Sequence, residues 1–224
     1  MPVQLDAVEL RVLGVLIEKS LTQASSYPLT LNAVVLGSNQ KHNREPLLCL
    51  TEEDVARALY SLQQKELAAH AATTPGARAN RFEHCVNIQL AWDRREQAVM
   101  AELMLRGRQT AGELRARAGR MVAIPDLEAV TAILRGLMEQ EPPLVEELAR
   151  EPGRSANRFR HLLGTDGAST SERATDGRTP SAVGDGPEPA TTEAGAPAGD
   201  PFIGLAQRVE RLEQRMARFE SLLE

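Results

Sequence analysis

Pro75-Gly76-Ala77-Arg78-Ala79-Asn80-Arg81-Phe82-Glu83-His84 returns later in the chain as Pro152-Gly153-Arg154-Ser155-Ala156-Asn157-Arg158-Phe159-Arg160-His161. Both stretches read P-G-x-x-A-N-R-F-x-H, and they lie 152 − 75 = 77 residues apart. A shared pattern of this length indicates an internal duplication. Because the spacing exceeds the roughly 20–50 residues of a solenoid unit and two copies are present, the sequence predicts a duplicated small domain.

Ahead of each repeat lies a stretch whose apolar residues recur at spacings of three and four, the pattern of a helix with one buried face. The stretch begins at Thr51 in the first copy and at Asp126 in the second, and both are short polar residues that can cap a helix start. The apolar residues are Val55, Leu59, Leu62 and Leu67 in the first copy, and Leu127, Val130, Leu134 and Leu137 in the second. A helix is therefore predicted directly before each repeat.

Two further helices are expected upstream in each copy. The first carries an apolar stripe, made of Leu5, Val8, Val12, Leu16 and Ile17 in copy one and of Trp92, Val99, Leu103 and Met104 in copy two. The second begins at Thr30 in copy one, with Leu31, Val34 and Val35 turned inward. In copy two it begins at Thr110, which forms a T-x-x-E capping box with Glu113, and Gly119 is placed to end it.

The Pro-Gly pairs inside the repeats are turn signals flanked by short segments that are predicted to be strands. These strands cover residues 67–73 and 81–88 in the first copy, and 144–148 and 158–162 in the second. Three helices followed by a β-hairpin form a winged helix, whose second and third helices make the helix-turn-helix and whose hairpin is the wing. The predicted fold is mainly α with small β-hairpins (α+β), arranged as two tandem winged-helix domains over residues 1–90 and 91–163.

The tail divides into two segments. Residues 164–201 are rich in Gly, Ala, Pro, Ser, Thr and acid, which predicts a disordered acidic linker. Residues 202–224 predict an amphipathic coiled-coil helix, with Arg208 and Arg215 at g positions facing Glu213 and Glu220 at e positions. Such a helix would join two chains into a homodimer through Phe202, Leu205, Val209, Leu212, Met216, Phe219 and Leu223. The alternative is a helix that docks back on its own core, because about three heptads are marginal alone.

Four motifs resemble the YceH family of bacterial proteins. They are Tyr27-Pro28-Leu29-Thr30, Asn39-Gln40-Lys41-His42-Asn43-Arg44-Glu45-Pro46, Leu105-Arg106-Gly107-Arg108-Gln109-Thr110-Ala111-Gly112-Glu113-Leu114 and Leu148-Ala149-Arg150-Glu151-Pro152-Gly153. The resemblance covers residues 3–163 and the short C-terminal helix, whereas the linker matches poorly. It implies two winged-helix domains in tandem. It implies no activity, substrate or partner, so no functional residue is carried over.

Charge is unevenly distributed along the chain. Residues 1–163 carry 20 Lys/Arg and 20 Asp/Glu, whereas residues 164–224 carry 6 and 11, so the tail accounts for the whole net charge of −5. A neutral globular part neither excludes nor indicates nucleic-acid binding. The chain has no apolar run near the ~20 residues that a membrane span needs, and its N-terminus shows no secretory signal. A cytoplasmic protein without membrane contact is expected.

No pattern in the chain predicts catalysis. The sequence lacks a nucleophile elbow, a phosphate loop and a dinucleotide fingerprint, so we expect no enzyme, no catalytic residues and no cofactor. Cys49 and Cys85 are expected to be reduced, buried thiols. Metal is not expected, since His42, His70, His84 and His161 are scattered singles without paired ligands. His84 and His161 are expected at equivalent, half-buried strand positions.

A nucleic-acid interface is the more serious candidate. The exposed face of the third helix in copy one should contain Glu53, Arg57, Tyr60, Ser61 and Gln64, and Arg and Gln are good base readers. Acidic residues 52–54 at its start oppose phosphate contact, as does the more acidic helix face of copy two. The candidate nucleic-acid-binding residues are Lys41, Arg44, Arg57, Gln64, Arg78, Arg81, Arg154, Arg158 and Arg160. Further basic charge surrounds the second helix of copy two, at Arg106, Arg108, Arg115, Arg117 and Arg120.

Two functions follow from this pattern. The first is duplex DNA binding in a regulatory role. The alternative is a winged-helix scaffold that contacts protein partners through its acidic third helices and binds no DNA. The arginines themselves suit a phosphate footprint and a solvated surface paired with acids equally well. A continuous basic track joining both wings would favour DNA, whereas acidic helix faces with arginines held by carboxylates would favour the scaffold.

Overall fold

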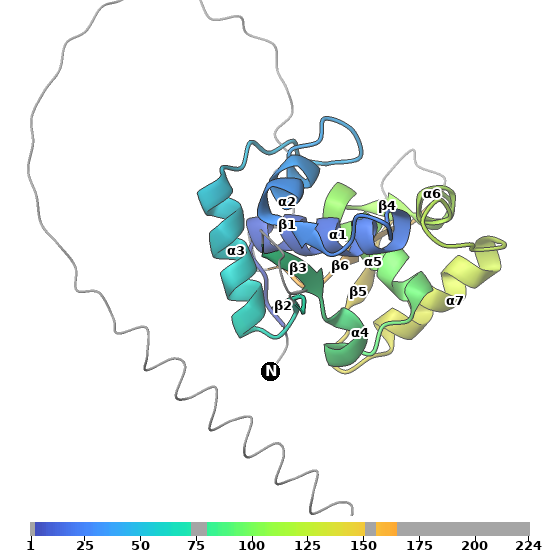
Figure 1. The fold of residues 1–224 in the computed structure, drawn as a ribbon. Helices are drawn as coiled ribbons and strands as arrows, with labels where there is room; N and C mark the ends of the chain where they lie inside the picture. Colours follow the sequence, from blue (N-terminus) through green and yellow to red (C-terminus); the bar gives the residue numbers. More distant parts are fainter. Residues whose placement is uncertain (1–2, 73–79, 151–155, 165–224) are drawn as a thin grey trace, which may run out of the picture. The chain divides into compact units, whose positions relative to one another are not determined.

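The computed structural model describes residues 3–72, 80–150 and 156–164 (Figure 1). The described residues all belong to the first of two compact units, Met1–Ala174. They form a mixed α+β structure with small antiparallel sheets, which confirms the predicted class. The predicted linker and the predicted coiled coil lie outside the described residues.

The elements of each copy follow the same order. Copy one contains α1 (Ala7–Thr22), β1 (Leu29–Thr30), α2 (Leu31–Ser38), α3 (Glu52–Gln64), β2 (Ala68–His70) and β3 (Arg81–His84). Copy two contains α5 (Arg94–Arg106), β4 (Gln109–Thr110), α6 (Ala111–Ala118), α7 (Leu127–Met138), β5 (Val145–Leu148) and β6 (Arg158–His161). The short helix α4 (Val86–Gln89) lies between them.

The second and third helices of each copy begin where the sequence predicts. The first helices begin at Ala7 and Arg94, so Leu5 and Trp92, which were predicted in their apolar stripes, precede them. The side chains of Thr30, Thr51, Thr110 and Asp126 each accept a hydrogen bond from the first turn of the helix that follows. The predicted capping box from Thr110 to Glu113 is also confirmed. These short-range hydrogen bonds satisfy backbone N–H groups that a helix start leaves unpaired.

The two sheets have matching strand orders and registers. Each is antiparallel and three-stranded, in the order β1-β3-β2 in copy one and β4-β6-β5 in copy two. Phe82 pairs with Leu29 in the first sheet, and Phe159 pairs with Gln109 in the second, so the two phenylalanines of the repeat occupy equivalent places. The strands β1 and β4 were not predicted, because two residues are too few to show an alternating pattern.

Two predicted strands are too long. The strand expected over residues 67–73 covers only Ala68–His70. The expected strand over residues 81–88 ends at His84, and Val86–Gln89 forms α4 instead. The backbone N–H of Cys85 donates to the carbonyl of Leu67 at 2.8 Å and closes the strand pairing. The chain then turns into a helix that buries Val86.

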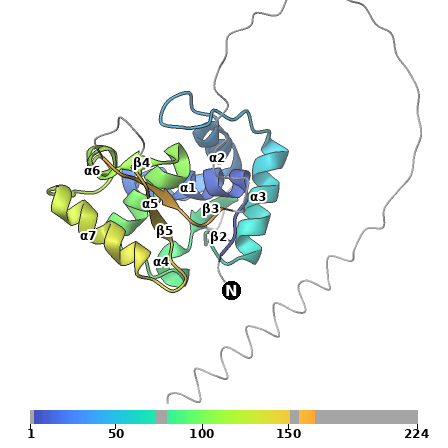
Figure 2. The same ribbon diagram turned by 180° about the vertical axis from the view of Figure 1, so that it is seen from behind.

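The two copies share one hydrophobic core, and α1 and α5 lie at its centre. Each helix has nine consecutive buried residues, 9–17 in α1 and 97–105 in α5. A helix covered on one face would bury only its apolar stripe, so both helices are covered on several sides. Both views show α1 and α5 between α3 and α7 (Figures 1 and 2). A Cβ atom at Gly14 would lie 2.9 Å from the side chain of Leu105. Glycine at this position therefore lets α1 and α5 pack closely.

The ends of the two copies also meet. The backbone N–H of Leu5 donates to the carbonyl of Leu163 at 2.7 Å, and Leu5 forms a parallel bridge with Gly164. In the described part of the chain, no helix is both long and apolar enough to cross a membrane.

Candidate nucleic-acid interface

The outer face of α3 contains the predicted side chains. Arg57, Tyr60 and Gln64 are exposed, and Tyr60 has 65% of its surface accessible. Ser61 is only half-buried and lies at the edge of this face. The start of the helix is acidic, since Glu52 and Glu53 are exposed and Asp54 follows them. These carboxylates stabilise the positive end of the helix dipole, but they repel phosphate.

Arg57 is held by an acid of its own helix. Its Nη2 atom donates to Asp54 Oδ1 at 2.6 Å, although 69% of the Arg57 side chain is exposed. Asp54 also accepts hydrogen bonds from the backbone and hydroxyl of Thr51. The Thr51 backbone bond, the Thr51 hydroxyl and then Arg57 lower the pKa of Asp54. The carboxylate therefore stays charged beside the arginine that was predicted to read bases.

An open hollow lies between the start of α1 and α3. It has a volume of about 340 Å³ and is lined by Asp6, Val8, Asp54, Arg57, Ala58 and Ser61. Its two carboxylates are already engaged, because Asp6 caps α1 and Asp54 bonds to the cap of α3. The hollow is thus a product of two neighbouring helix starts.

The repeat arginines of β3 and β6 occupy equivalent positions. Arg81 pairs with Thr30 in one sheet and Arg158 with Thr110 in the other. The Nη1 atom of Arg81 donates to the carbonyl of Pro28 at 2.7 Å, and that of Arg158 donates to the carbonyl of Arg108 at 3.2 Å. Both carbonyls lie two residues before the capping threonine, so the bonds are equivalent. These arginines therefore help to attach the first strand of each sheet.

The other predicted wing residues divide into two groups. Arg160 forms an ion pair with Glu146 on the neighbouring strand β5. Arg78 and Arg154 lie outside the described residues. Of the wing arginines, only the strand residues Arg81, Arg158 and Arg160 are described, and each of these has a partner within the chain.

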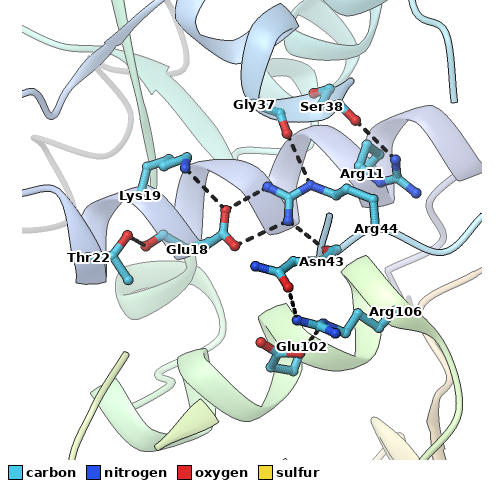
Figure 3. A network of polar contacts seen from close by, with 10 residues as sticks. All are labelled: Arg11, Glu18, Lys19, Thr22, Gly37, Ser38, Asn43, Arg44, Glu102 and Arg106. Carbon is cyan, nitrogen blue, oxygen red and sulfur yellow. Dashed lines mark hydrogen bonds and ion pairs between the residues drawn. The ribbon is translucent and has the colours of Figure 1, made fainter. Parts of the chain in front are cut away.

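Arg44 is not a surface residue, and its predicted position in the interface is wrong. Its side chain is 0% exposed and forms a two-point ion pair with Glu18 of α1, Nη2 to Oε2 at 2.6 Å and Nη1 to Oε1 at 3.1 Å (Figure 3). Its Nε atom donates to the carbonyl of Gly37 at 3.0 Å, and Nη1 also donates to that of Asn43 at 2.7 Å. By contrast, Lys41 on the same loop is exposed.

A second buried arginine anchors the same loop, residues 39–50. Arg11 of α1 donates to the carbonyl of Ser38 at 3.1 Å and to that of Pro46 at 2.6 Å. Burial, followed by the positive charge of Arg44, lowers the pKa of Arg11 to about 10. Asn39 closes the loop, since its side chain donates to the carbonyl of Leu50 and accepts from its N–H, both at 2.8 Å. The loop is therefore fixed at both ends and in its middle.

The anchored loop also contacts copy two. The N–H of Glu45 donates to the carbonyl of Leu105 at 2.8 Å, and Arg106 donates to the side chain of Asn43 (Figure 3). Arg106 pairs with Glu102 of its own helix at 3.0 Å. Burial raises the pKa of Glu102, while nearby arginines oppose that effect. This seam between the copies was not predicted, because no sequence pattern indicates which loop meets which helix.

The histidines His84 and His161 occupy equivalent strand positions, as predicted. His84 pairs with Ala68, and His161 pairs with Val145, in matching registers. Both are half-buried. Burial lowers the pKa of each to about 4, and the charge of Arg160 contributes in the case of His161. The Nε2 atom of His84 lies 2.8 Å from the hydroxyl of Ser20.

The cysteines differ from expectation. Cys49 is exposed and Cys85 is half-buried, so the prediction of two buried thiols is wrong. Cys49 lies near the end of the anchored loop. Backbone carbonyls, and not apolar side chains, connect this loop to the buried Arg11 and Arg44. Among the residues that the structure describes, no group of three or more His, Cys, Asp and Glu side chains could hold a metal ion.

Comparison with known proteins identifies relatives of this chain. Residues 5–154 match the family model described as "Protein of unknown function, DUF480". A UPF0502 protein of Geobacter metallireducens is 49% identical over 159 residues, which cover 71% of this chain and 72% of the relative. A UPF0502 protein of Geotalea uraniireducens is 43% identical over 217 residues, which cover 97% of this chain and 90% of the relative. The longer alignment extends into the predicted linker, residues 164–201, which was expected to match the family poorly. The narrower YceH resemblance stays a prediction.

We predict that the buried Arg44–Glu18 pair is required for stability. Arg44→Met should lower the free energy of unfolding by about 3–5 kcal/mol, because it leaves a carboxylate and several carbonyls without their donor. Glu18→Gln should act in the same direction by leaving Arg44 charged and buried. Urea denaturation measures both effects. The matched control is Arg57→Met, which breaks an exposed ion pair of equal length, 2.6 Å, and should cost less than about 1 kcal/mol. Equal effects of Arg44→Met and Arg57→Met would contradict the anchoring role.

We also predict that stability falls as pH drops below about 6.5. Above pH 6.5, their ordinary pKa, His84 and His161 are neutral in the folded and in the unfolded chain. Below pH 6.5 the unfolded chain binds protons at both histidines, whereas the folded chain does not bind them until about pH 4. The urea midpoint should therefore decrease between about pH 7 and pH 5, before most carboxylates titrate. The double variant His84→Gln/His161→Gln should flatten this dependence. His42→Gln/His70→Gln should retain it, because it leaves His84 and His161 intact. An unchanged slope in the first variant would refute the assignment.

Proposed function

The chain belongs to the family of proteins of unknown function DUF480, and from that premise we propose that it is a non-enzymatic tandem winged-helix protein that binds duplex DNA in a regulatory role. The proposal combines the duplicated architecture with the distribution of charge.

The winged-helix assignment is supported by the order of elements. In each copy, the second and third helices follow the first strand, and the second and third strands form an antiparallel hairpin. A helix-turn-helix followed by such a hairpin is the arrangement that a winged helix requires. The segments between these strands include residues 73–79 and 151–155, which lie outside the described residues. They contain two of the five repeat arginines, Arg78 and Arg154.

The observation that carries the DNA proposal is the charge of one short segment. Residues 106–120, which include β4 and α6, contain five arginines and a single acid, Glu113. The corresponding part of copy one, residues 20–40 with β1 and α2, contains no charged residue. A concentration of arginine in one short segment attracts the phosphate backbone, which dominates the affinity of DNA-binding proteins.

The mode of binding follows from the third helices. Acids stand at the start of α3, and Arg57 is already held by Asp54. In α7, Glu128 lies in the first turn. Gln64 is also exposed and is a residue type that can read bases. Unlike Arg57, it has no acidic residue in its own turn of α3. We propose binding that depends mainly on phosphates and less on base contacts.

A protein scaffold is the second candidate. It is favoured by the outer face of α3, where the exposed Tyr60 lies beside acidic residues and beside an arginine held by a carboxylate. Tyrosine and arginine are enriched at protein interfaces. On this alternative the third helix of copy one contacts a protein partner and DNA is not bound.

Salt dependence tests the DNA proposal. The full chain should bind a random-sequence duplex of about 30 base pairs with log K falling steeply as log salt rises, since each neutralised phosphate contributes about 0.9 to the slope. Changing Arg78, Arg81, Arg154 and Arg158 together to alanine should flatten the slope by roughly 3 to 4. Changing Arg57 and Gln64 instead should alter sequence preference and retain most of the slope. Thermal unfolding verifies that each variant is folded. If the unmodified chain fails to bind at low salt, where electrostatic attraction is greatest, the scaffold becomes the better proposal.

The proposal includes a homodimer formed by residues 202–224, which lie outside the described residues. Removing them should halve the mass measured by sedimentation at tens of micromolar. Leu212→Asp should do the same, because an apolar seam strongly disfavours an unpaired carboxylate. Gln214→Asp introduces the same charge outside the predicted a and d positions and should leave the mass unchanged. A monomeric unmodified chain would eliminate the coiled coil and favour docking on its own core.

A further inference from the structure

We infer that duplex DNA lies across the seam between the two copies, on a surface formed by Lys41, Arg106, Arg117 and Arg120. This seam surface combines the anchored loop of copy one with α5, α6 and the residue that follows α6 in copy two. The inference rests on the proposed function and specifies where the phosphate backbone would lie. It differs from binding centred on the third helices.

The loop and α5 are joined directly, so the surface does not depend on two independently moving parts. The N–H of Glu45 is bonded to the carbonyl of Leu105, and Asn43 accepts from Arg106 (Figure 3). Lys41 is exposed two residues before Asn43 on this loop. An exposed cation of copy one is thereby attached close to the arginines of copy two.

Arg106 marks the centre of the cationic cluster. It pairs with Glu102, but 18% of its side chain stays exposed. Burial lowers its pKa first, and the positive charges of Arg117, Arg120 and Arg44 lower it further against the effect of Glu102. Contacts link Arg106 to Arg117: Arg117 donates to the side chain of Gln109, Gln109 donates to the carbonyl of Glu102, and Glu102 is the ion-pair partner of Arg106. Two like charges joined by this network repel each other. An anion placed over the cluster would relieve this repulsion.

Arg117 of α6 is held in position by two contacts. Arg117 donates to the side chain of Gln109 at 2.6 Å and lies 3.6 Å from Glu113. Arg120 is exposed just after the end of α6. A side chain that is already held loses less conformational freedom when it binds a phosphate. These contacts therefore favour a preformed phosphate-binding surface.

The loop itself has no equivalent in copy two. Residues 39–51 separate α2 from α3, whereas the shorter segment 119–126 separates α6 from α7. The longer loop is fixed by Arg11, Arg44 and the pairing of Asn39 with Leu50. Its position next to α5 thus extends the basic surface of copy two onto copy one. A linear polyanion fits a surface that continues across both copies, and duplex DNA carries one charge per about 1.7 Å of its axis.

The test uses the full chain and a fluorescein-labelled, random-sequence duplex of about 30 base pairs, titrated between about 50 and 200 mM salt. The seam variant is Lys41→Gln/Arg117→Gln/Arg120→Gln. The matched control removes three exposed charges elsewhere, as Arg94→Gln/Arg95→Gln/Arg135→Gln. Both variants change the net charge equally, and the control includes the exposed arginine of α7.

The seam variant should flatten the slope of log K against log salt by about 2 to 3, whereas the control should stay near the unmodified slope. The double variant Lys41→Gln/Arg120→Gln leaves the bonds of Arg117 intact and should flatten the slope by roughly 2. Circular dichroism melting verifies the fold of each variant. If the unmodified chain binds and the seam variants match the control, the seam assignment is overturned while DNA binding stands. If the unmodified chain does not bind at low salt, both proposals fail.

Discussion

The contact between α1 and α5 is the constraint on which the described structure depends. Each helix is buried over nine consecutive residues, so neither belongs to one copy alone. Gly14 allows the approach, because any larger residue would meet Leu105. The next residue, Arg106, then lies beside the loop of copy one and bonds to Asn43. The seam surface is therefore a consequence of how the two first helices pack. Two independent winged helices joined by a mobile connection would not form it.

The duplication has kept positions that hold the sheets together and has changed those that face solvent. Arg81 and Arg158 make equivalent bonds to the first strand of each sheet, and His84 and His161 lie in equivalent registers. By contrast, α2 is uncharged and leaves Leu36 63% exposed, whereas α6 is rich in arginine. The residues shared by the two repeats are thus those that hold the strands of each sheet together. The differences between α2 and α6 favour separate tasks for the two copies.

The local features of the fold were accessible from sequence, and the long-range ones were not. Helix starts at Thr51 and Thr110 could be predicted because a cap and its bonded N–H groups lie within four residues. The core strands of the hairpins followed from the turn signals. Arg44 was assigned to the surface because a charged residue in a polar loop is usually solvated. Its burial depends on Glu18, which lies 26 residues earlier on another element. The same limit applies to β1 and β4, which pair with strands distant in sequence.

The buried arginines explain how a long polar loop becomes fixed without an apolar core of its own. A loop that enters the protein must find donors for its carbonyls, and a guanidinium supplies five N–H groups in one side chain. Arg11 and Arg44 donate their N–H groups to carbonyls at the end of α2, and Arg11 also donates to a carbonyl of the loop. Glu18 compensates the charge of Arg44. Because these bonds occupy the buried side of the loop, Lys41 and His42 stay exposed on a fixed backbone. If the proposed winged-helix fold is correct, the acidic starts of the third helices disfavour its usual entry into the major groove. The proposed DNA binding would then require a rigid basic surface elsewhere that contacts the phosphates.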